Sequence, residues 1–417
     1  MSTRSKLILS AVISLAVFAG IVTAGRADQK DRDPARPLVI GHRGSAGYLP
    51  DHTLQGYALA IERGADFVEP DLVSTKDGRL IARHEPNMIA TTDVASRPEF
   101  ASRRKFVSID GAAPEEGFFA SDFTLAEIKT LRAIQPIPSD RLTVFDGKFQ
   151  IPTLEEVIDL VKRKSKEKGR TIGIYPETKH PTYHRSIGLP LEERLAKILK
   201  NAGWDRRDSP VFLQSFEPSS LQRLRQLTRN RLIQLIDAND VHPDGTLDFT
   251  APFDRPYDWT VSGNPVSQAR TFAFLVTNAG LDEVRTYADG IGPWKRYIVS
   301  TAAIKLDANG GVADANGDGK IDESDLKLLP PTDVIGRAHA KGLLVHTWTF
   351  RNEPRRLAAD YRNIPVAEYL QFYQIGVDGV FSDFADTAVT ARVLFRLLSD
   401  PGFGPCFIEA PGAHGCD

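Results

Sequence analysis

Cysteine is scarce in this chain of 417 residues, which contains only Cys406 and Cys416. Both lie at the C-terminal end, where His414 is the histidine nearby, so a metal site built on thiolates is not expected there. In an exported chain the two thiols are expected to pair and close a small loop, and two free thiols are the alternative.

An excess of charge of one sign is also missing. The formal net charge is −2, although 25% of the residues are charged. Nucleic acid is therefore not an expected partner, because proteins that bind it carry a basic footprint. The 41% of hydrophobic residues is typical of a globular protein. The sequence favours no particular oligomeric state.

The long apolar run of the chain lies at its N-terminus, from Leu7 to Val22. Arg4 and Lys6 precede this run, and small residues follow it up to Ala24, which is the pattern of a secretory signal peptide over residues 1–24. An uncleaved membrane anchor is the alternative. Cleavage predicts a periplasmic or secreted protein that no longer inserts stably in a membrane.

Three short apolar runs of the early chain each lead into polar groups that can do chemistry. The first leads into His42 and Arg43, the second into Glu69 and Asp71, and the third into His84. Short apolar runs bounded by Gly and Pro are typical of buried strands. In a closed barrel of parallel strands the C-terminal strand ends meet at one mouth, where the chemistry takes place. These five side chains therefore predict a site.

Similar runs continue along the chain and alternate with helical spacing. They predict nine strands, at residues 38–41, 67–73, 80–84, 171–177, 211–214, 232–236, 286–291, 343–348 and 379–381. Helices are predicted at residues 54–63, 154–164, 191–201, 221–228, 332–341 and 365–375. The fold class is therefore α/β, a (β/α)₈ TIM-type barrel over residues 38–395 with one strand in excess. A β-hairpin irregularity is expected near strands 2 and 3, because Ser74–Arg79 is too short for a parallel crossover.

Long segments interrupt the alternation. Residues 88–150 are expected to form an insertion over the barrel mouth, where loops often set specificity, and a solvated excursion is the alternative. Residues 237–274 are Pro-, Asp- and Gly-rich and predict another long loop. Residues 25–37 are expected to be a flexible lead-in, and residues 396–417 a C-terminal tail with the disulfide loop.

Four motifs follow one another in the order that is typical of a known family. They are His42-Arg43-Gly44, Pro50-Asp51-His52-Thr53, Glu69-Pro70-Asp71 and His84-Glu85. Later motifs are Pro176-Glu177-Thr178-Lys179, Leu213-Gln214-Ser215-Phe216, His346-Thr347-Trp348-Thr349 and Phe381-Ser382-Asp383-Phe384. The chain resembles the glycerophosphodiester phosphodiesterase (GDPD) family, in its larger periplasmic branch. Asp51 and Glu85 replace the usual Glu and Asp of the motifs and keep the charge.

The resemblance implies a role for each of nine residues. It implies a metal site of Glu69, Asp71 and Glu177, catalytic His42 and His84, phosphate contacts from Arg43 and Lys179, and Phe216 and Trp348 near the alcohol. Ligation by oxygen alone favours Ca²⁺, with Mg²⁺ as the second choice. The alternatives are that the acids only pair with the two bases, and that the two aromatics are ordinary core residues.

The reaction expected from these residues is the metal-dependent hydrolysis of glycerophosphodiesters to glycerol 3-phosphate and an alcohol. His42 is assigned first as the general base and His84 as the acid, although the reverse and a route through a cyclic phosphate stay open. The small-molecule phosphodiester is the expected partner. The alternatives are a phospholipase-type enzyme that acts on intact lipids and a non-catalytic calcium-dependent binding protein.

A second metal motif lies in an insertion at residues 307–326. The residues at the ligand positions of an EF-hand loop are Asp314, Asn316, Asp318, Lys320 (through its carbonyl), Asp322 and Asp325. Gly319 stands at the sharp turn, and Asp325 replaces the usual Glu. The loop resembles the dockerin-type calcium loop and predicts bound Ca²⁺ with a structural role. An acidic, glycine-rich loop without an ion is the alternative.

Overall fold

The computed structural model describes residues 33–34 and 36–400. The predicted signal peptide at residues 1–24, most of the lead-in at residues 25–37, and most of the tail at residues 396–417, with Cys406 and Cys416, lie outside the described residues. The first residues of the predicted tail belong to a helix that ends at Ser399. No helix of the described part is both long and apolar enough to cross a membrane.

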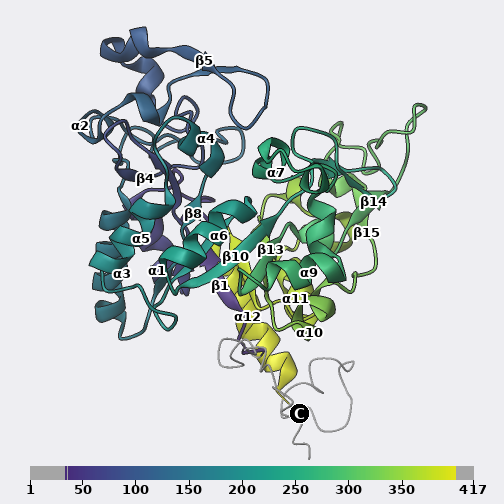
Figure 1. The fold of residues 1–417 in the computed structure, drawn as a ribbon. Coiled ribbons are helices and arrows are strands. Elements are labelled where there is room, and N and C mark those ends of the chain that lie inside the picture. The colour runs from purple at the N-terminus through teal and green to yellow at the C-terminus, as the bar shows by residue number, and fades with distance from the viewer. Residues whose placement is uncertain (1–32, 35, 401–417) are drawn as a thin grey trace, which may run out of the picture.

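The centre of the molecule is a closed barrel of parallel strands (Figure 1). Its strands are β1 (Leu38–Gly41), β2 (Phe67–Val68) with β3 (Asp71–Ser74), β7 (Gly173–Ile174) with β8 (Glu177–Thr178), β9 (Phe212–Ser215), β10 (Arg231–Ile236), β13 (Gly290–Pro293), β16 (Leu344–Phe350) and β17 (Gly379–Ser382). The ring closes because β1 pairs with both β17 and β2, while β2 pairs with β7 and β3 with β8. The predicted α/β barrel is thus confirmed.

The strand in excess is β4 (Leu80–Ala82), which pairs antiparallel with β3 and stands outside the barrel. It forms the predicted hairpin, with the turn after Ser74. Two of the eight barrel strands are interrupted, one at Pro70 between β2 and β3 and one at Pro176 between β7 and β8. Proline has no backbone N–H and cannot donate to a ladder, which explains both breaks.

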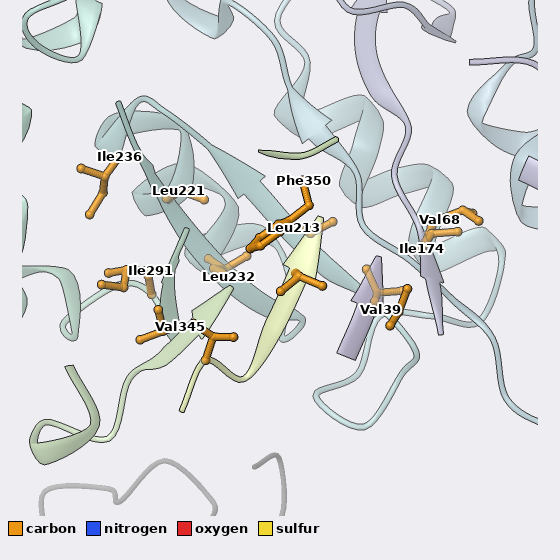
Figure 2. Packing of buried hydrophobic residues seen from close by; sticks show 14 of the residues in the cluster. Val39, Val68, Ile174, Leu213, Leu221, Leu232, Ile236, Ile291, Val345 and Phe350 are labelled. Atoms are coloured by element: carbon orange, nitrogen blue, oxygen red, sulfur yellow. The ribbon is translucent and has the colours of Figure 1, made fainter. Parts of the chain in front are cut away.

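Adjacent residues of each strand belong to two separate cores. Ile40 and Phe212 lie in the cluster that fills the barrel interior. Val39 and Leu213, one residue away in each strand, lie in the larger cluster between the barrel and its helices (Figure 2). This is the period of two of a strand whose two faces are both buried.

Helices surround the barrel (Figure 1). They are α1 (Leu54–Glu62), α3 (Leu154–Lys168), α5 (Glu192–Asn201), α6 (Pro218–Leu227), α9 (Asn278–Val284), α10 (Val334–Ala340), α11 (Pro365–Gln374) and α12 (Ala385–Ser399). Helix α3 begins at a capping box, because Thr153 and Glu156 bond to each other's backbone N–H, and ends at Gly169 in the left-handed region. Helices α9 and α12 were not among the predicted helices.

The insertion at residues 88–150 lies beside the hairpin, above the barrel in Figure 1. Its elements are η2 (Asp93–Ser96), η3 (Pro98–Arg103), β5 (Lys105–Val107), β6 (Glu115–Gly117), η4 (Ala120–Asp122) and α2 (Leu125–Ile128). Met88, Phe100 and Phe123 pack against Val73 and Ile81 of the hairpin in a core of their own. The hairpin therefore serves as the platform on which the insertion is built.

Shorter elements fill the remaining connections. They are α4 (Pro181–Ser186), β11 (Asp240–Val241), β12 (Leu247–Asp248), α7 (Tyr257–Val261), α8 (Pro265–Gln268), η5 (Phe272–Val276), η6 (Lys295–Tyr297), β14 (Thr301–Ala303), η7 (Glu323–Asp325), β15 (Leu326–Leu328), η8 (Pro354–Arg356) and η9 (Ala359–Tyr361). The segment at residues 237–274, expected as a loop, thus contains a short hairpin and two short helices.

Candidate active site

The barrel mouth contains a cavity of about 210 Å³. All nine residues for which the family resemblance implies a role line this cavity, namely His42, Arg43, Glu69, Asp71, His84, Glu177, Lys179, Phe216 and Trp348. Residues of several strands therefore converge at one place, as the barrel topology requires.

Three buried carboxylates stand at the two interruptions of the barrel. Glu69 follows β2, whereas Asp71 begins β3 and Glu177 begins β8. One oxygen of each lies within 4.8 Å of the others, so the three could hold a metal ion. Asp71 and Glu177 are also paired in register across the β3–β8 ladder. Glu69 thus lies in the break between β2 and β3, and Asp71 and Glu177 begin the strands that resume after Pro70 and Pro176.

The charge state of the acids reflects their crowding. Burial raises the pKa of Glu69 well above its ordinary value, and the nearby Asp71 and Glu177 carboxylates raise it further. Burial also raises the pKa of Glu177 to about 7, although Lys179 opposes this. Burial would raise the pKa of Asp71 too, but His52 lowers it below its ordinary value. Without a cation the cluster therefore retains protons, and a divalent ion would displace them.

Asp71 has one oxygen, Oδ1, that is buried and accepts no hydrogen bond from the described residues. Its other oxygen, Oδ2, lies 3.1 Å from His52 Nε2. A buried carboxylate oxygen without a partner is costly, and a metal ion would satisfy it. The donor set of three carboxylates therefore fits a hard cation such as Ca²⁺ or Mg²⁺.

His42 follows β1 and is oriented by a partner from the far end of the chain. Its Nδ1 lies 2.5 Å from Asp383 Oδ1, and Asp383 follows β17, the neighbour of β1. Its Nε2 lies 3.8 Å from Glu69 Oε2 and faces the acids. Burial lowers the pKa of His42, and the Asp383 carboxylate opposes the shift. Gly44, at φ +96°, keeps this loop close to α1, because a Cβ there would lie 2.8 Å from the Gly56 carbonyl carbon.

His84 reaches the mouth by a different path than predicted. Strand β4 runs antiparallel to the barrel strands, so its C-terminal end does not lie among theirs. It brings the chain back beside the start of β3 instead. There the Arg83 N–H donates a hydrogen bond to the Asp71 carbonyl at 2.8 Å. His84 Nδ1 lies 2.7 Å from Glu85 Oε1, and its Nε2 lies 3.4 Å from Lys179 Nζ. Burial, Arg43 and Lys179 together lower the pKa of His84 to about 3.

Two cations stand among the acids. The Arg43 backbone N–H donates to Glu69 Oε2 at 3.0 Å, and its guanidinium lies 3.2 Å from Asp51 Oδ2. Lys179 Nζ lies 3.1 Å from Glu177 Oε1. Pairing of the acids with bases, the alternative to metal binding, is therefore present. It leaves carboxylate oxygens such as Asp71 Oδ1 without a partner in the part of the chain that the structure describes, and these could bind a metal ion.

Phe216 and Trp348 close one side of the cavity. Their rings meet edge to face with centroids 5.8 Å apart. The Trp348 indole N–H donates to the Gly292 carbonyl at 2.7 Å, which fixes its ring, and Lys179 Nζ lies 5.5 Å from the Phe216 ring centre. The two aromatics thus line the site while also packing on the core.

Four further residues support the site and had no predicted role. Gln214 donates to Glu69 Oε1 at 2.7 Å, and His52 bonds to Asp71. Arg141 of the insertion and Arg351 both donate to Asp383 Oδ2. Gln214 and His52 stand within the quoted motifs, and Arg351 directly follows a strand end. Arg141 carried no signal that separates it from other arginines of the insertion.

The EF-hand-like loop shows a different geometry. Its carboxylates do not converge as the three acids of the mouth do within the described residues. Side-chain oxygens of Asp314, Asn316, Asp318, Asp322 and Asp325 instead accept hydrogen bonds from backbone N–H groups of the same loop. Lys320 donates one of these bonds through its backbone N–H. Glu323 of the same loop lines the catalytic cavity.

Acids, imidazoles and cations at the mouth of a parallel barrel define an α/β-barrel enzyme. The model of the glycerophosphoryl diester phosphodiesterase family matches residues 42–387. The chain therefore belongs to this family.

Individual relatives agree with this assignment. A glycerophosphodiester phosphodiesterase of Arabidopsis thaliana, GDPD6, is 34% identical over 87% of this chain and 87% of its own. The Haemophilus influenzae glycerophosphodiester phosphodiesterase is 27% identical over 93% of this chain and 98% of its own. The crystal structure of a Silicibacter pomeroyi protein that is named for the same family has a TM-score of 0.56 at 16% identity. The match covers 89% of this chain and 99% of that protein. At this identity the likeness supports the fold and not the activity.

Proposed function

We propose that the protein hydrolyses glycerophosphodiesters to glycerol 3-phosphate and an alcohol, with a divalent cation and histidine acid–base catalysis. The observation that carries this is the group of three buried carboxylates within 4.8 Å, beside two imidazoles. The names of the full-length relatives support the substrate class. Membership of a family of phosphodiesterases argues against the non-catalytic alternative.

Glu69, Asp71 and Glu177 would hold the cation, and Ca²⁺ is the first choice with Mg²⁺ as the second. When bound, the cation supplies charge stabilisation at a phosphoryl oxygen. The chain itself adds Arg43 and Lys179, which lie on the same cavity and can bind the remaining phosphate oxygens. Two cations beside a metal ion suit the charge that develops on a phosphodiester during displacement.

His42 acts as the base in this proposal. The buried Asp383 carboxylate holds its Nδ1 and stabilises the imidazolium that forms when Nε2 takes a proton from water or from the glycerol hydroxyl. His84 acts as the acid, because it lines both the catalytic cavity and the larger cavity beside it. A bound phosphodiester anion would offset Arg43 and Lys179, the cations that lower the pKa of His84.

Release of glycerol 3-phosphate from glycerophosphocholine tests the proposal. Activity is expected to vanish with a chelator and to return with Ca²⁺ or Mg²⁺. His42→Ala and His84→Ala are each expected to lose about 10²–10⁴-fold in kcat. His242→Ala is the matched control, because this histidine is exposed and does not line the catalytic cavity. Near-full activity of either active-site variant would refute its assignment.

Calcium in the EF-hand-like loop is a separate part of the proposal, and the sequence pattern supports it. The ion would replace the internal backbone hydrogen bonds of the loop as the partner of its side chains. Isothermal titration of an Asp314→Ala, Asp318→Ala double variant is expected to show one calcium fewer than the wild type. Unchanged stoichiometry would exclude the site.

Export is the last part of the proposal, and only the N-terminal sequence supports it. Fractionation of cells that express the full chain is expected to recover the protein outside the cytoplasm. The mature protein is expected to begin near residue 25. Recovery of the uncut chain in the membrane fraction would favour the anchor instead.

A further inference from the structure

A second, larger cavity of about 550 Å³ adjoins the catalytic cavity. The two share Arg43, His84, Lys179 and Trp348, among others, so a substrate held by its phosphate at the first can extend into the second. Its outer wall comes from the insertion, from α4 and from residues 252–257. A volume of this size admits alcohols of many sizes, so selection must come from the chemistry of the wall.

Charge is one feature of that wall. Its cation His180 already bonds to two acids, with Nε2 2.9 Å from Glu85 and Nδ1 2.5 Å from Asp110. The other cation beyond the catalytic set, Arg255, bonds to Asp254. Both cations of the outer wall are therefore matched by carboxylates.

Glu115, Glu217 and Asp237 are the carboxylates of the wall that form no ion pair in the described part of the chain, whereas Glu85, Asp110 and Glu177 are paired. Glu115 is exposed, and burial raises the pKa of Glu217 to about 8, so Asp237 is the half-buried one that is free to face a cation at neutral pH. It directly follows β10, so it stands at the C-terminal end of a barrel strand, where side chains face the mouth. One oxygen accepts a hydrogen bond from the neighbouring Ala238 N–H at 2.9 Å. Burial raises its pKa to about 6, so it is still ionised at neutral pH.

Aromatic rings are the other feature of the wall. Trp348 lies at the junction of the two cavities with its ring fixed by the bond to Gly292. Phe253, with 54% of its surface exposed, lies on the outer part of the wall. The face of an aromatic ring attracts an ammonium group, and a nearby carboxylate strengthens the binding.

We propose that the second cavity binds the alcohol portion of the substrate and selects an alcohol that carries an ammonium group. Asp237 is its counter-ion, and Trp348 and Phe253 offer ring faces. Asp237 is therefore a specificity-determining residue. This inference rests on the proposed phosphodiesterase function, and it adds a preference among phosphodiesters that the catalytic residues do not explain.

Two esters of glycerol 3-phosphate that differ only in charge test the proposal. One is the 2-(trimethylammonio)ethyl ester, and the other is the 3,3-dimethylbutyl ester, its uncharged isostere. The wild type is expected to show a kcat/KM about tenfold higher for the charged ester. Asp237→Asn keeps the shape and the hydrogen bond from Ala238, and is expected to bring the ratio close to one. Phe253→Leu, at an exposed position, is expected to lower the ratio in part.

Asp240→Asn is the matched control, because Asp240 is exposed, lies three residues further along and does not line the cavity. It is expected to keep the wild-type ratio. Equal kcat/KM values for the two esters in the wild type, or a wild-type ratio in both Asp237→Asn and Phe253→Leu, would overturn the inference while leaving the phosphodiesterase function in place. Hydrolysis of neither ester by the wild type would instead refute the proposed function.

Discussion

Asp383 binds three side chains in one buried cluster at the mouth. It accepts from His42, Arg141 and Arg351, which come from the segment after β1, the insertion and the segment after β16. Burial alone would raise the pKa of Asp383, but His42 and Arg141 hold it well below its ordinary value. A carboxylate that stays ionised keeps the proton of the neutral imidazole on Nδ1 and leaves Nε2 free to accept one. The insertion thus reaches the proposed base through a single residue.

Glu217, on the wall of the second cavity, predicts a pH dependence of stability. Burial, Asp258 and Asp110 raise its pKa to about 8, although Thr182 donates to it. Between its ordinary value of 4.5 and about 8 the folded protein binds this proton and the unfolded chain does not. The Glu217 proton is therefore expected to contribute a fall in the free energy of unfolding as the pH rises from about 5 to 8, which urea unfolding at several pH values measures by comparison with a Glu217 variant.

Glu217→Gln mimics the protonated acid and is expected to flatten that slope. Glu99→Gln, at an exposed position, is the control and is expected to keep the wild-type slope. The same slope in Glu217→Gln and in the wild type would show that another group is responsible.

At this scale the sequence predicts which side chains gather at the barrel mouth better than it predicts what orients them. His42, Glu69 and Glu177 are polar residues that directly follow apolar runs, and this pattern can be recognised in the sequence alone. The bond from His42 to Asp383 spans 341 positions and depends on the pairing of β1 with β17. Such partners follow from the closed topology and cannot be read from local pattern.

Among the elements, the loop before the first helix and the start of the insertion are joined by one buried arginine. Arg83 is fully buried, and its guanidinium donates to the backbone carbonyls of Asp51, His52 and Thr91, as well as to Ala82. The carbonyls belong to the loop after β1 and to the start of the insertion. One side chain therefore joins three segments that form the mouth.

Arg83→Met is expected to destabilise the protein by at least about 3 kcal/mol, because several buried carbonyls lose their donors. Urea unfolding measures the change. Arg79 lies in the same hairpin and forms an exposed pair with Glu155 of α3, so Arg79→Met is expected to change stability by about 0.5 kcal/mol or less. Equal effects of the two substitutions would show that the buried bonds contribute nothing.

Helices and strands whose apolar residues recur in a regular pattern were predictable from the sequence, and elements without such a pattern were not. The eight barrel strands and the hairpin follow from short apolar runs, and six of the surrounding helices follow from apolar spacing. Helix α9 has only seven residues, which is too short for a clear apolar pattern. Helix α12 begins soon after the last strand and has no side-chain N-cap to mark its start, because the polar residues there, Ser382 and Asp383, belong to the site. The hairpin of β11 and β12 was not predicted because each strand has only two residues, one of them an aspartate, and all four are at least partly exposed.

For the molecule as a whole, the carboxylate cluster predicts that stability depends on divalent ions. A ligand that binds only the folded state adds about 2.7 kcal/mol to the free energy of unfolding at 100 times its Kd. Ca²⁺ is expected to raise the Tm of chelator-treated protein accordingly. The Asp314→Ala, Asp318→Ala background isolates the contribution of the mouth, and adding Glu177→Gln to it is expected to abolish the rise. A full rise in that triple variant would place the stabilising ion elsewhere.

The pairing of β1 with β17 also bears on how the chain is made. Leu38 lies against Gly379, so the first strand has no partner on one edge until nearly the whole described sequence has left the ribosome. Contacts this distant in sequence form slowly. A nascent chain of this protein must therefore keep that edge unpaired throughout its synthesis, which makes it a candidate for chaperone protection until its last strand emerges.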